Sequence, residues 1–246
     1  LLAPSEAVNV LTVGASHSDA SAAARPDDVR ELIQEPRLPA PYSRIGLGYR
    51  RAVKPDLLAP GGRGWYREAP GSDGVARFAL IHGRRGAGLE HACPGQAATA
   101  TSHTGRTSGT SNAAAICTRN VAFAHEALRP LLDDVPPERR SNAHEALLLR
   151  ALAVHTADWG EALNQFRPLL NGLVDSRRIK DHTARFVGYG VMRPDRMTAC
   201  TAQRATVLGL GRLSDGAAHQ FRLPVPPGVG GHVGWKRLTV TLAWFT

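Results

Sequence analysis

One serine stands where a loop rich in small residues leads into a helical sequence pattern. Residues 107–115 run Thr-Ser-Gly-Thr-Ser-Asn-Ala-Ala-Ala, and the second serine is Ser111. The first turn of a helix offers free N–H groups and the positive end of the helix dipole, which can stabilise an oxyanion formed beside a nucleophilic hydroxyl. A serine before a helix is also the commonest N-cap, so this segment alone leaves both roles open.

The other residues suited to chemistry form weaker patterns. His91 and Cys93 make one close pair, whereas a zinc site needs three or four converging ligands. The cysteines Cys93, Cys117 and Cys200 include no Cys-x-x-Cys spacing, which argues against a disulfide framework. The glycine-rich segment 83–88 lacks the Gly-Lys-Ser/Thr ending of a phosphate-binding loop and is interpreted as a hairpin turn. We therefore predict no metal site and no cofactor.

The composition is that of a basic chain that can fold. Its 246 residues are 43% apolar and 21% charged, which favours a globular domain over disorder. The net charge of +9 suggests nucleic acid as a partner, but the basic residues are spread along the chain and only 6% of residues are aromatic. We predict no nucleic-acid binding. We also predict no membrane segment, because no apolar run approaches the roughly 20 residues that a spanning helix needs.

The patterns predict a mixed α/β chain to about residue 200, followed by a β-rich segment. Helices are predicted at residues 111–132 and 142–155, with a shorter one at 158–170 and a brief one at 28–34 within a surface loop (16–41). The predicted strands are residues 8–15 and an apolar segment at 53–60, a hairpin of 77–82 with 89–93, and tail strands at 204–210, 219–223 and 237–245. Residues 97–109 have the composition of a loop.

Four motifs in chain order resemble those of the subtilisin-like serine proteases, the subtilases of peptidase family S8. They comprise a strand ending in Val-Gly-Ala, a Lys-Pro-Asp…Ala-Pro-Gly stretch preceded by Tyr-Ser, the Gly-Thr-Ser nucleophile motif before a small-residue helix, and a Gly-x-Gly turn after later helices. The matching residues are Val13-Gly14-Ala15, Tyr42-Ser43 with Lys54-Pro55-Asp56 and Ala59-Pro60-Gly61, Gly109-Thr110-Ser111, and Gly188-Tyr189-Gly190.

The resemblance implies a parallel sheet flanked by helices and a serine endopeptidase that forms an acyl-enzyme on Ser111. The chain departs from the usual motif at Asn112, where the family has Met, and at Ala115, where it has Pro. The triad Asp and His and the oxyanion Asn of subtilases come from segments that would precede Leu1. His91 and His103 lie closest upstream of Ser111, but nothing around them resembles the family's His-Gly context.

These observations predict the C-terminal part of a subtilase catalytic domain at residues 1–202 and a truncated β-rich extension at 203–246. The chain begins with Leu1 and ends on an apolar run, so we expect an internal fragment of a serine protease that acts on peptide or protein substrates. Alone, this fragment is expected to be inactive. The alternative is a catalytically dead subtilase-like scaffold or protein-binding module. Compartment, oligomeric state and peptide specificity stay open.

Overall fold

The chain divides into two units in a computed structural model. The first comprises Leu1–Thr118 and Ala157–Met192, and the second comprises Arg119–Thr156 and Arg193–Thr246. The structure describes residues 3, 5–19, 21, 24–71, 73–81, 86–95, 97, 99–137, 141–231 and 233–245.

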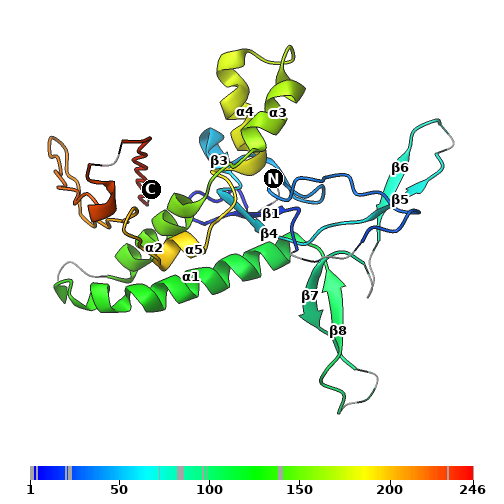
Figure 1. Cartoon of the computed structure of the whole chain (residues 1–246), viewed down its shortest axis with the longest axis horizontal. Coiled ribbons are helices and arrows are strands. Elements are labelled where there is room, and N and C mark those ends of the chain that lie inside the picture. The colour runs from blue at the N-terminus through cyan, green and yellow to red at the C-terminus, as the bar shows by residue number, and fades with distance from the viewer. Residues whose placement is uncertain are drawn as a thin grey trace. The chain divides into compact units, whose positions relative to one another are not determined.

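Two parallel strands form the centre of the first unit (Figure 1). Strand β1 (Val13–Ser16) pairs with β4 (Leu57–Pro60), and the first three residues of β4 are fully buried. The other edge of β4 is also occupied, because the Leu58 N–H donates to the Gly190 carbonyl at 2.8 Å and the Leu58 carbonyl accepts from the Met192 N–H at 2.9 Å. Strand β4 is therefore hydrogen-bonded on both edges, which explains its continuous apolar sequence.

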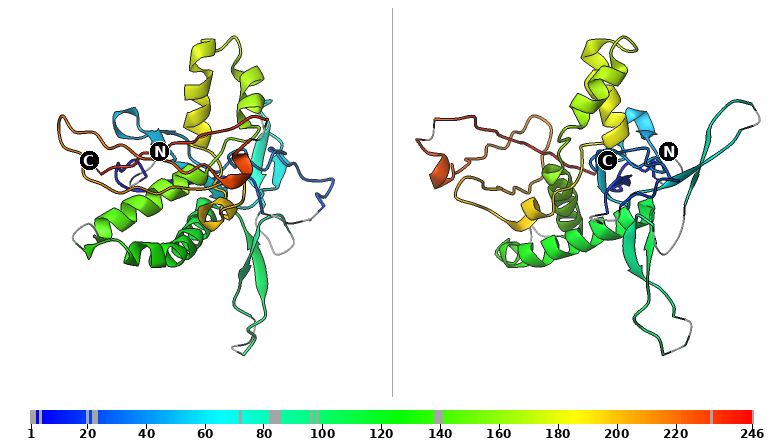
Figure 2. Two further views of the ribbon diagram at one scale, coloured as in Figure 1. Left: turned by 60° about the vertical axis from the view of Figure 1, so that its left-hand side comes forward. Right: turned by 45° about the vertical axis from the view of Figure 1, so that its right-hand side comes forward.

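A pair of helices packs against this strand. Helices α3 (Ala162–Leu170) and α4 (Ile179–Val187) lie side by side, with the rings of Phe166 and Phe186 stacked at 4.9 Å between centroids (Figure 2). Helix α3 starts later than predicted. Asp158, the first residue of the predicted range, lies outside the helix and forms an ion pair with Arg37 at 2.9 Å.

The chain between β4 and the serine segment forms two separate antiparallel hairpins (Figure 2). Strand β5 (Tyr66–Ala69) pairs with β6 (Arg77–Leu80), and β7 (Leu89–Ala92) pairs with β8 (Thr104–Thr107). The predicted hairpin of residues 77–82 with 89–93 is therefore wrong. Strand β6 pairs with the strand that precedes it in the chain, and β7 pairs with the strand that follows it. The glycine-rich turn at 83–88 lies partly outside the described residues.

Residues 28–34, all of which the structure describes, form no helix, so the helix predicted there is wrong. Arg30 is extended there and exchanges two backbone hydrogen bonds of 2.8 Å with Tyr66. Two further short strands, β2 (Gly46–Leu47) and β3 (Val53–Lys54), pair across the 3-10 helix η1 (Tyr49–Arg51), and a second 3-10 helix, η3 (Ser176–Arg178), precedes α4.

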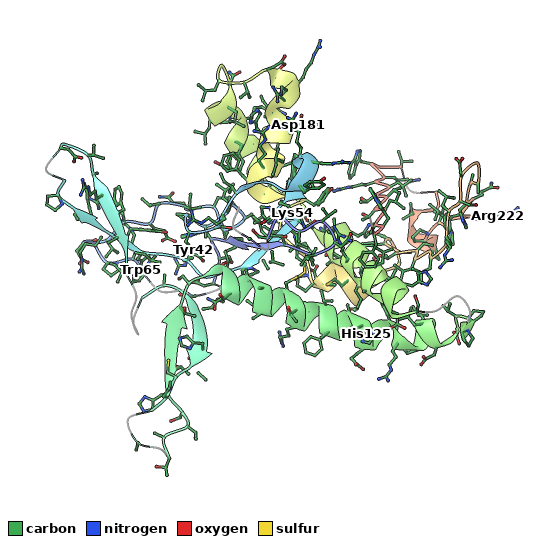
Figure 3. All side chains as sticks on the ribbon, turned by 180° about the vertical axis from the view of Figure 1, so that it is seen from behind. Tyr42, Lys54, Trp65, His125, Asp181 and Arg222 are labelled. Atoms are coloured by element: carbon green, nitrogen blue, oxygen red, sulfur yellow. The ribbon has the colours of Figure 1, made fainter. Side chains whose placement is uncertain are left out.

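The two longest predicted helices are confirmed. Helix α1 (Thr110–Asp133) and helix α2 (Asn142–Thr156) extend the predicted ranges by at most one residue at each end. In the second unit His125 of α1, labelled in Figure 3, lies 3.4 Å from the carboxylate of Glu145 on α2. A short helix, α5 (Asp195–Thr198), contacts α2.

The structure does not show the predicted β-rich tail. Between 203 and 245 the described residues contain no strand, only the 3-10 helix η4 (Pro227–Val229). Two of the predicted strands do run close together, since the backbone at Gly209 lies beside the Phe221 ring and the His219 Nε2 lies 3.0 Å from the Arg212 carbonyl. These contacts involve side chains, and no described backbone hydrogen bonds join the two segments as strands of a sheet. The boundary at residues 202/203 stays a prediction.

A buried ion pair fixes the start of β4. Lys54 is 1% exposed and donates from Nζ to the Asp56 carboxylate at 2.6 Å and to the Val10 carbonyl at 2.7 Å (Figure 3). The same carboxylate oxygen accepts the Thr12 N–H at 2.7 Å, directly before β1. The Lys-Pro-Asp motif therefore connects the entries of both parallel strands.

We predict that Lys54→Met lowers the free energy of unfolding by about 3 kcal/mol, because it leaves the Asp56 charge buried without its cation. Urea unfolding of the purified chain measures this loss. Lys180→Met, at an exposed site on α4, serves as the matched control and should change stability by less than about 0.5 kcal/mol. Equal effects of the two substitutions would contradict the structural role of this pair.

Candidate functional site

Ser111 is the second residue of α1 and is exposed. Strand β8 leads through Ser108 and Gly109 directly into this helix, so the serine follows a short connection from a hairpin. Neither the N–H nor the hydroxyl group of Ser111 is hydrogen-bonded to any residue that the structure describes. A free hydroxyl therefore stands beside a free backbone donor at the start of a long helix.

The residues on either side of Ser111 are bound to the end of β4. The Gly109 N–H donates to the Gly61 carbonyl at 2.9 Å, and the Asn112 side-chain amide donates to the same carbonyl at 3.1 Å. That amide also donates to the Thr107 carbonyl at 3.1 Å. Ser111 is thus held between two residues that share one acceptor.

Close packing at Gly61 makes this junction possible. A Cβ atom there would lie 2.4 Å from the Cβ of Ala15 and 3.1 Å from the Gly109 carbonyl oxygen, so a side chain would separate β1 from the serine segment. The Tyr42 hydroxyl, labelled in Figure 3, donates to the Gly62 carbonyl at 2.5 Å. Burial raises the pKa of Tyr42 above its usual range, so the phenol keeps the proton that this bond needs.

The sequence model described as the Subtilase family, peptidase S8, matches residues 1–190, which is more than half of the chain. The chain belongs to the subtilase family. Members of this family are serine proteases that act on peptides or proteins. Comparisons with curated proteins and with solved structures found no match.

The subtilase motifs meet in space although they are distant in sequence. The Val-Gly-Ala motif forms β1, the Ala-Pro-Gly motif ends β4, and the Gly-Thr-Ser motif is bound to that end through Gly61. The Gly-x-Gly turn packs against the opposite end of β4. Gly188 adopts φ +60° there, and a Cβ atom at this position would lie 2.2 Å from the Pro55 carbonyl oxygen.

No histidine that the structure describes hydrogen-bonds the Ser111 hydroxyl. His91 and His103 both lie along the β7–β8 hairpin, where His91 contacts Ala92 and Cys93. The described residues contain no group of three or more His, Cys, Asp or Glu side chains placed to hold a metal ion. Among the described helices, none is both long and apolar enough to cross a membrane.

A cluster of charged side chains lies beyond the end of β1 and was not predicted from the sequence. The Arg63 guanidinium contacts Asp19 at 3.0 Å and Glu31 at 3.5 Å, and Asp19 also accepts the Gly88 N–H at 2.6 Å. Asp19, Glu31 and Arg63 line a pocket of about 640 Å³. His17, which is 1% exposed, also lines it. In the sequence they resembled solvated loop residues, and no local spacing links them.

His17 occupies the most buried place in this cluster. Its Nε2 lies 3.1 Å from the Glu31 carboxylate, and Arg63 and Asp19 are the other charged groups around it. Burial lowers the pKa of His17 below its ordinary value, an effect that Glu31 only partly opposes. The imidazole is therefore neutral in the folded protein at neutral pH.

We predict that Asn112→Ala lowers the free energy of unfolding by about 1–2 kcal/mol, because two carbonyls lose the same amide donor. The exchange of the Gly109 amide hydrogen should also become faster, since this bond depends on the same junction. Hydrogen exchange and urea unfolding measure the two effects. The exposed Asn164, whose amide donates among the described residues only to the exposed Glu161, provides the control Asn164→Ala. A loss no larger than in that control would show that Asn112 does not hold the serine segment.

We predict that the chain loses stability as the pH falls below about 6.5, the ordinary pKa of histidine. The folded state lowers the pKa of His17, and burial lowers the pKa of His155 as well, so the unfolded chain takes up these protons first. The stabilisation is fully present above pH 6.5 and disappears as the pH falls through the folded-state values. His17→Gln should flatten the profile of unfolding free energy between about pH 7 and pH 5. A profile as steep as that of the original chain would exclude His17 as a source of the acid sensitivity.

Proposed function

We propose that this protein is a serine endopeptidase that cleaves peptide bonds through an acyl-enzyme on Ser111. Membership of the subtilase family supports the reaction class. The observation that carries the assignment of the nucleophile is the exposed Ser111 hydroxyl at the start of α1, in a Gly-Thr-Ser motif bound to the end of β4.

The proposed chemistry proceeds in two steps. Ser111 Oγ attacks the carbonyl carbon of the scissile peptide bond while a general base takes the hydroxyl proton. The C–N bond then breaks, the amine leaves with that proton, and the acyl group stays on Oγ as an ester. Water attacks the ester in the second step, which releases the new carboxylate and restores the hydroxyl.

The backbone around Ser111 suits the charge that develops in these steps. The Ser111 N–H has no acceptor among the described residues and belongs to the first turn of α1, where the helix dipole favours negative charge. A donor at this position can stabilise the carbonyl oxygen as it becomes an oxyanion. Asn112 and Gly109 keep this donor in place through the Gly61 carbonyl.

The general base is proposed to come from residues that precede Leu1. No described histidine bonds to Ser111, and a serine without a base is a poor nucleophile. The proposal therefore places the Asp and His of the triad, and a side-chain oxyanion donor, in an upstream segment. Reading the coding sequence before the Leu1 codon tests this directly.

We predict that Ser111→Ala lowers kcat for peptide hydrolysis by more than about 1,000-fold in the polypeptide that includes the upstream segment. A fluorogenic peptide assay measures the rate, and mass spectrometry should locate a fluorophosphonate adduct on Ser111. Ser176→Ala, at another exposed serine that begins a short helix, is the control and should keep activity and labelling. An upstream segment without Asp and His, or labelling at another serine, would overturn the assignment and favour a catalytically dead scaffold.

The 246-residue chain alone should hydrolyse no peptide above the rate of its Ser111→Ala variant. This follows because no described side chain is hydrogen-bonded to the Ser111 hydroxyl to act as its base. Turnover by the isolated chain that disappears on Ser111→Ala would refute the proposed upstream base while retaining Ser111 as nucleophile.

A further inference from the structure

A thiol and an imidazole face each other on the β7–β8 hairpin. His91 lies on β7 opposite Gly105 of β8, and Cys93 follows two residues later, with its N–H bonded to the His103 carbonyl at 2.9 Å. Successive residues of a strand point to opposite faces, so His91, Cys93 and Gly105 share one face of the hairpin. His91 is exposed and Cys93 is half-buried.

Gly105 provides the space that brings these groups together. A Cβ atom at this position would lie 2.5 Å from the Cys93 Sγ and 3.3 Å from the His91 Nε2. Any larger residue would displace the thiol from the imidazole. The Cys93 Sγ lies 3.7 Å from both ring nitrogens of His91, Nδ1 and Nε2, within hydrogen-bonding range for sulfur.

The backbone assigns the proton positions of this pair. The His91 Nδ1 lies 2.8 Å from the Ala92 carbonyl oxygen, which can only accept a hydrogen bond, so the neutral ring carries its proton on Nδ1. Of the two ring nitrogens that lie 3.7 Å from the sulfur, only Nε2 then has a free lone pair that can accept the thiol proton. The Cys93 S–H therefore has a base in contact with it.

We propose that Cys93 and His91 form a thiol-modification site that reacts with small disulfides. The thiolate is the nucleophile in such exchange, and His91 takes the Cys93 proton on Nε2 as the thiolate forms. Cys93 Sγ then attacks one sulfur of the disulfide. A new S–S bond joins Cys93 to that half, the old S–S bond breaks, and the other half leaves as a thiolate. The incoming disulfide is the oxidant, and Cys93 is the group oxidised.

The other two cysteines are internal controls with different surroundings. Cys117 is 2% exposed, its thiol contacts the Met192 sulfur, and burial raises its pKa to about 11. Cys200 is exposed and makes no hydrogen bond to an imidazole within the described part of the chain. The chain therefore offers three thiols for comparison: the exposed Cys200, the buried Cys117, and Cys93 in contact with an imidazole.

The test exposes the folded chain to a nitrobenzoate disulfide at neutral pH, follows release of the coloured thiolate, and locates the adducts by peptide mass spectrometry. We expect Cys93 to react about ten-fold faster than Cys200, and Cys117 to react only on unfolding. Cys93→Ser should remove the fast phase, and Cys200→Ser should leave it unchanged. A fast phase on Cys200, or equal rates for Cys93 and Cys200, would overturn the proposal.

Two further variants separate the base from simple access. His91→Gln keeps a polar side chain but removes the proton acceptor, so the rate at Cys93 should fall to that of Cys200. Gly105→Ala keeps the imidazole but displaces the thiol, and should slow Cys93 as well while far-ultraviolet circular dichroism stays unchanged. A Cys93 rate that His91→Gln does not alter would show that exposure alone accounts for its reactivity. This assay does not depend on peptide hydrolysis, so its outcome is independent of the proposed protease activity.

Discussion

The carbonyl group of Gly61 is the point through which the nucleophile segment is attached to the sheet. It accepts from the Gly109 N–H and from the Asn112 amide, so the residues on both sides of Ser111 depend on one oxygen atom. Gly61 directly follows β4, which is hydrogen-bonded on both edges and cannot shift without disturbing two neighbours. The absence of a Cβ atom at Gly61 allows this contact, since a side chain would collide with Ala15.

The same junction explains how a long stretch of chain is accommodated between β4 and the serine. The chain leaves β4 at Gly62 and returns at Thr107, whose carbonyl oxygen would lie 2.8 Å from a Cβ atom at Gly62. Both hairpins therefore lie between Gly62 and Thr107, two residues that are in close contact. Residues on the hairpins, such as Cys93 and His91, can acquire chemistry of their own without changing the backbone that holds Ser111.

Beyond the end of β1, ion pairs act beside a small apolar cluster that includes Val29. The Arg63 guanidinium pairs with Asp19, which follows that strand, and with Glu31. Charges with little access to water need partners of opposite sign, so these pairs hold Asp19 and Glu31 together. His17, whose imidazole is neutral, lies 3.1 Å from the Glu31 carboxylate, and its burial lowers its pKa.

The sequence by itself determined the two longest helices, the family resemblance and the position of Ser111 at the start of the first of them. Helical periodicity is local, and the Gly-Thr-Ser, Ala-Pro-Gly and Gly-x-Gly motifs contain glycines whose backbone requirements appear in the structure as close contacts at Gly61 and Gly188.

The pairing of the strands could not be predicted from such local patterns. Residues 77–80 and 89–92 had the right composition for strands, but which segment pairs with which depends on turn geometry and on contacts distant in sequence. The tertiary structure alone decided that Asn112 is bound to Gly61, that Lys54 is buried against Asp56, and that Arg63 joins Asp19 and Glu31. A charged residue in a loop has the same sequence signature whether it is solvated or paired, because its partner is chosen only when the chain folds.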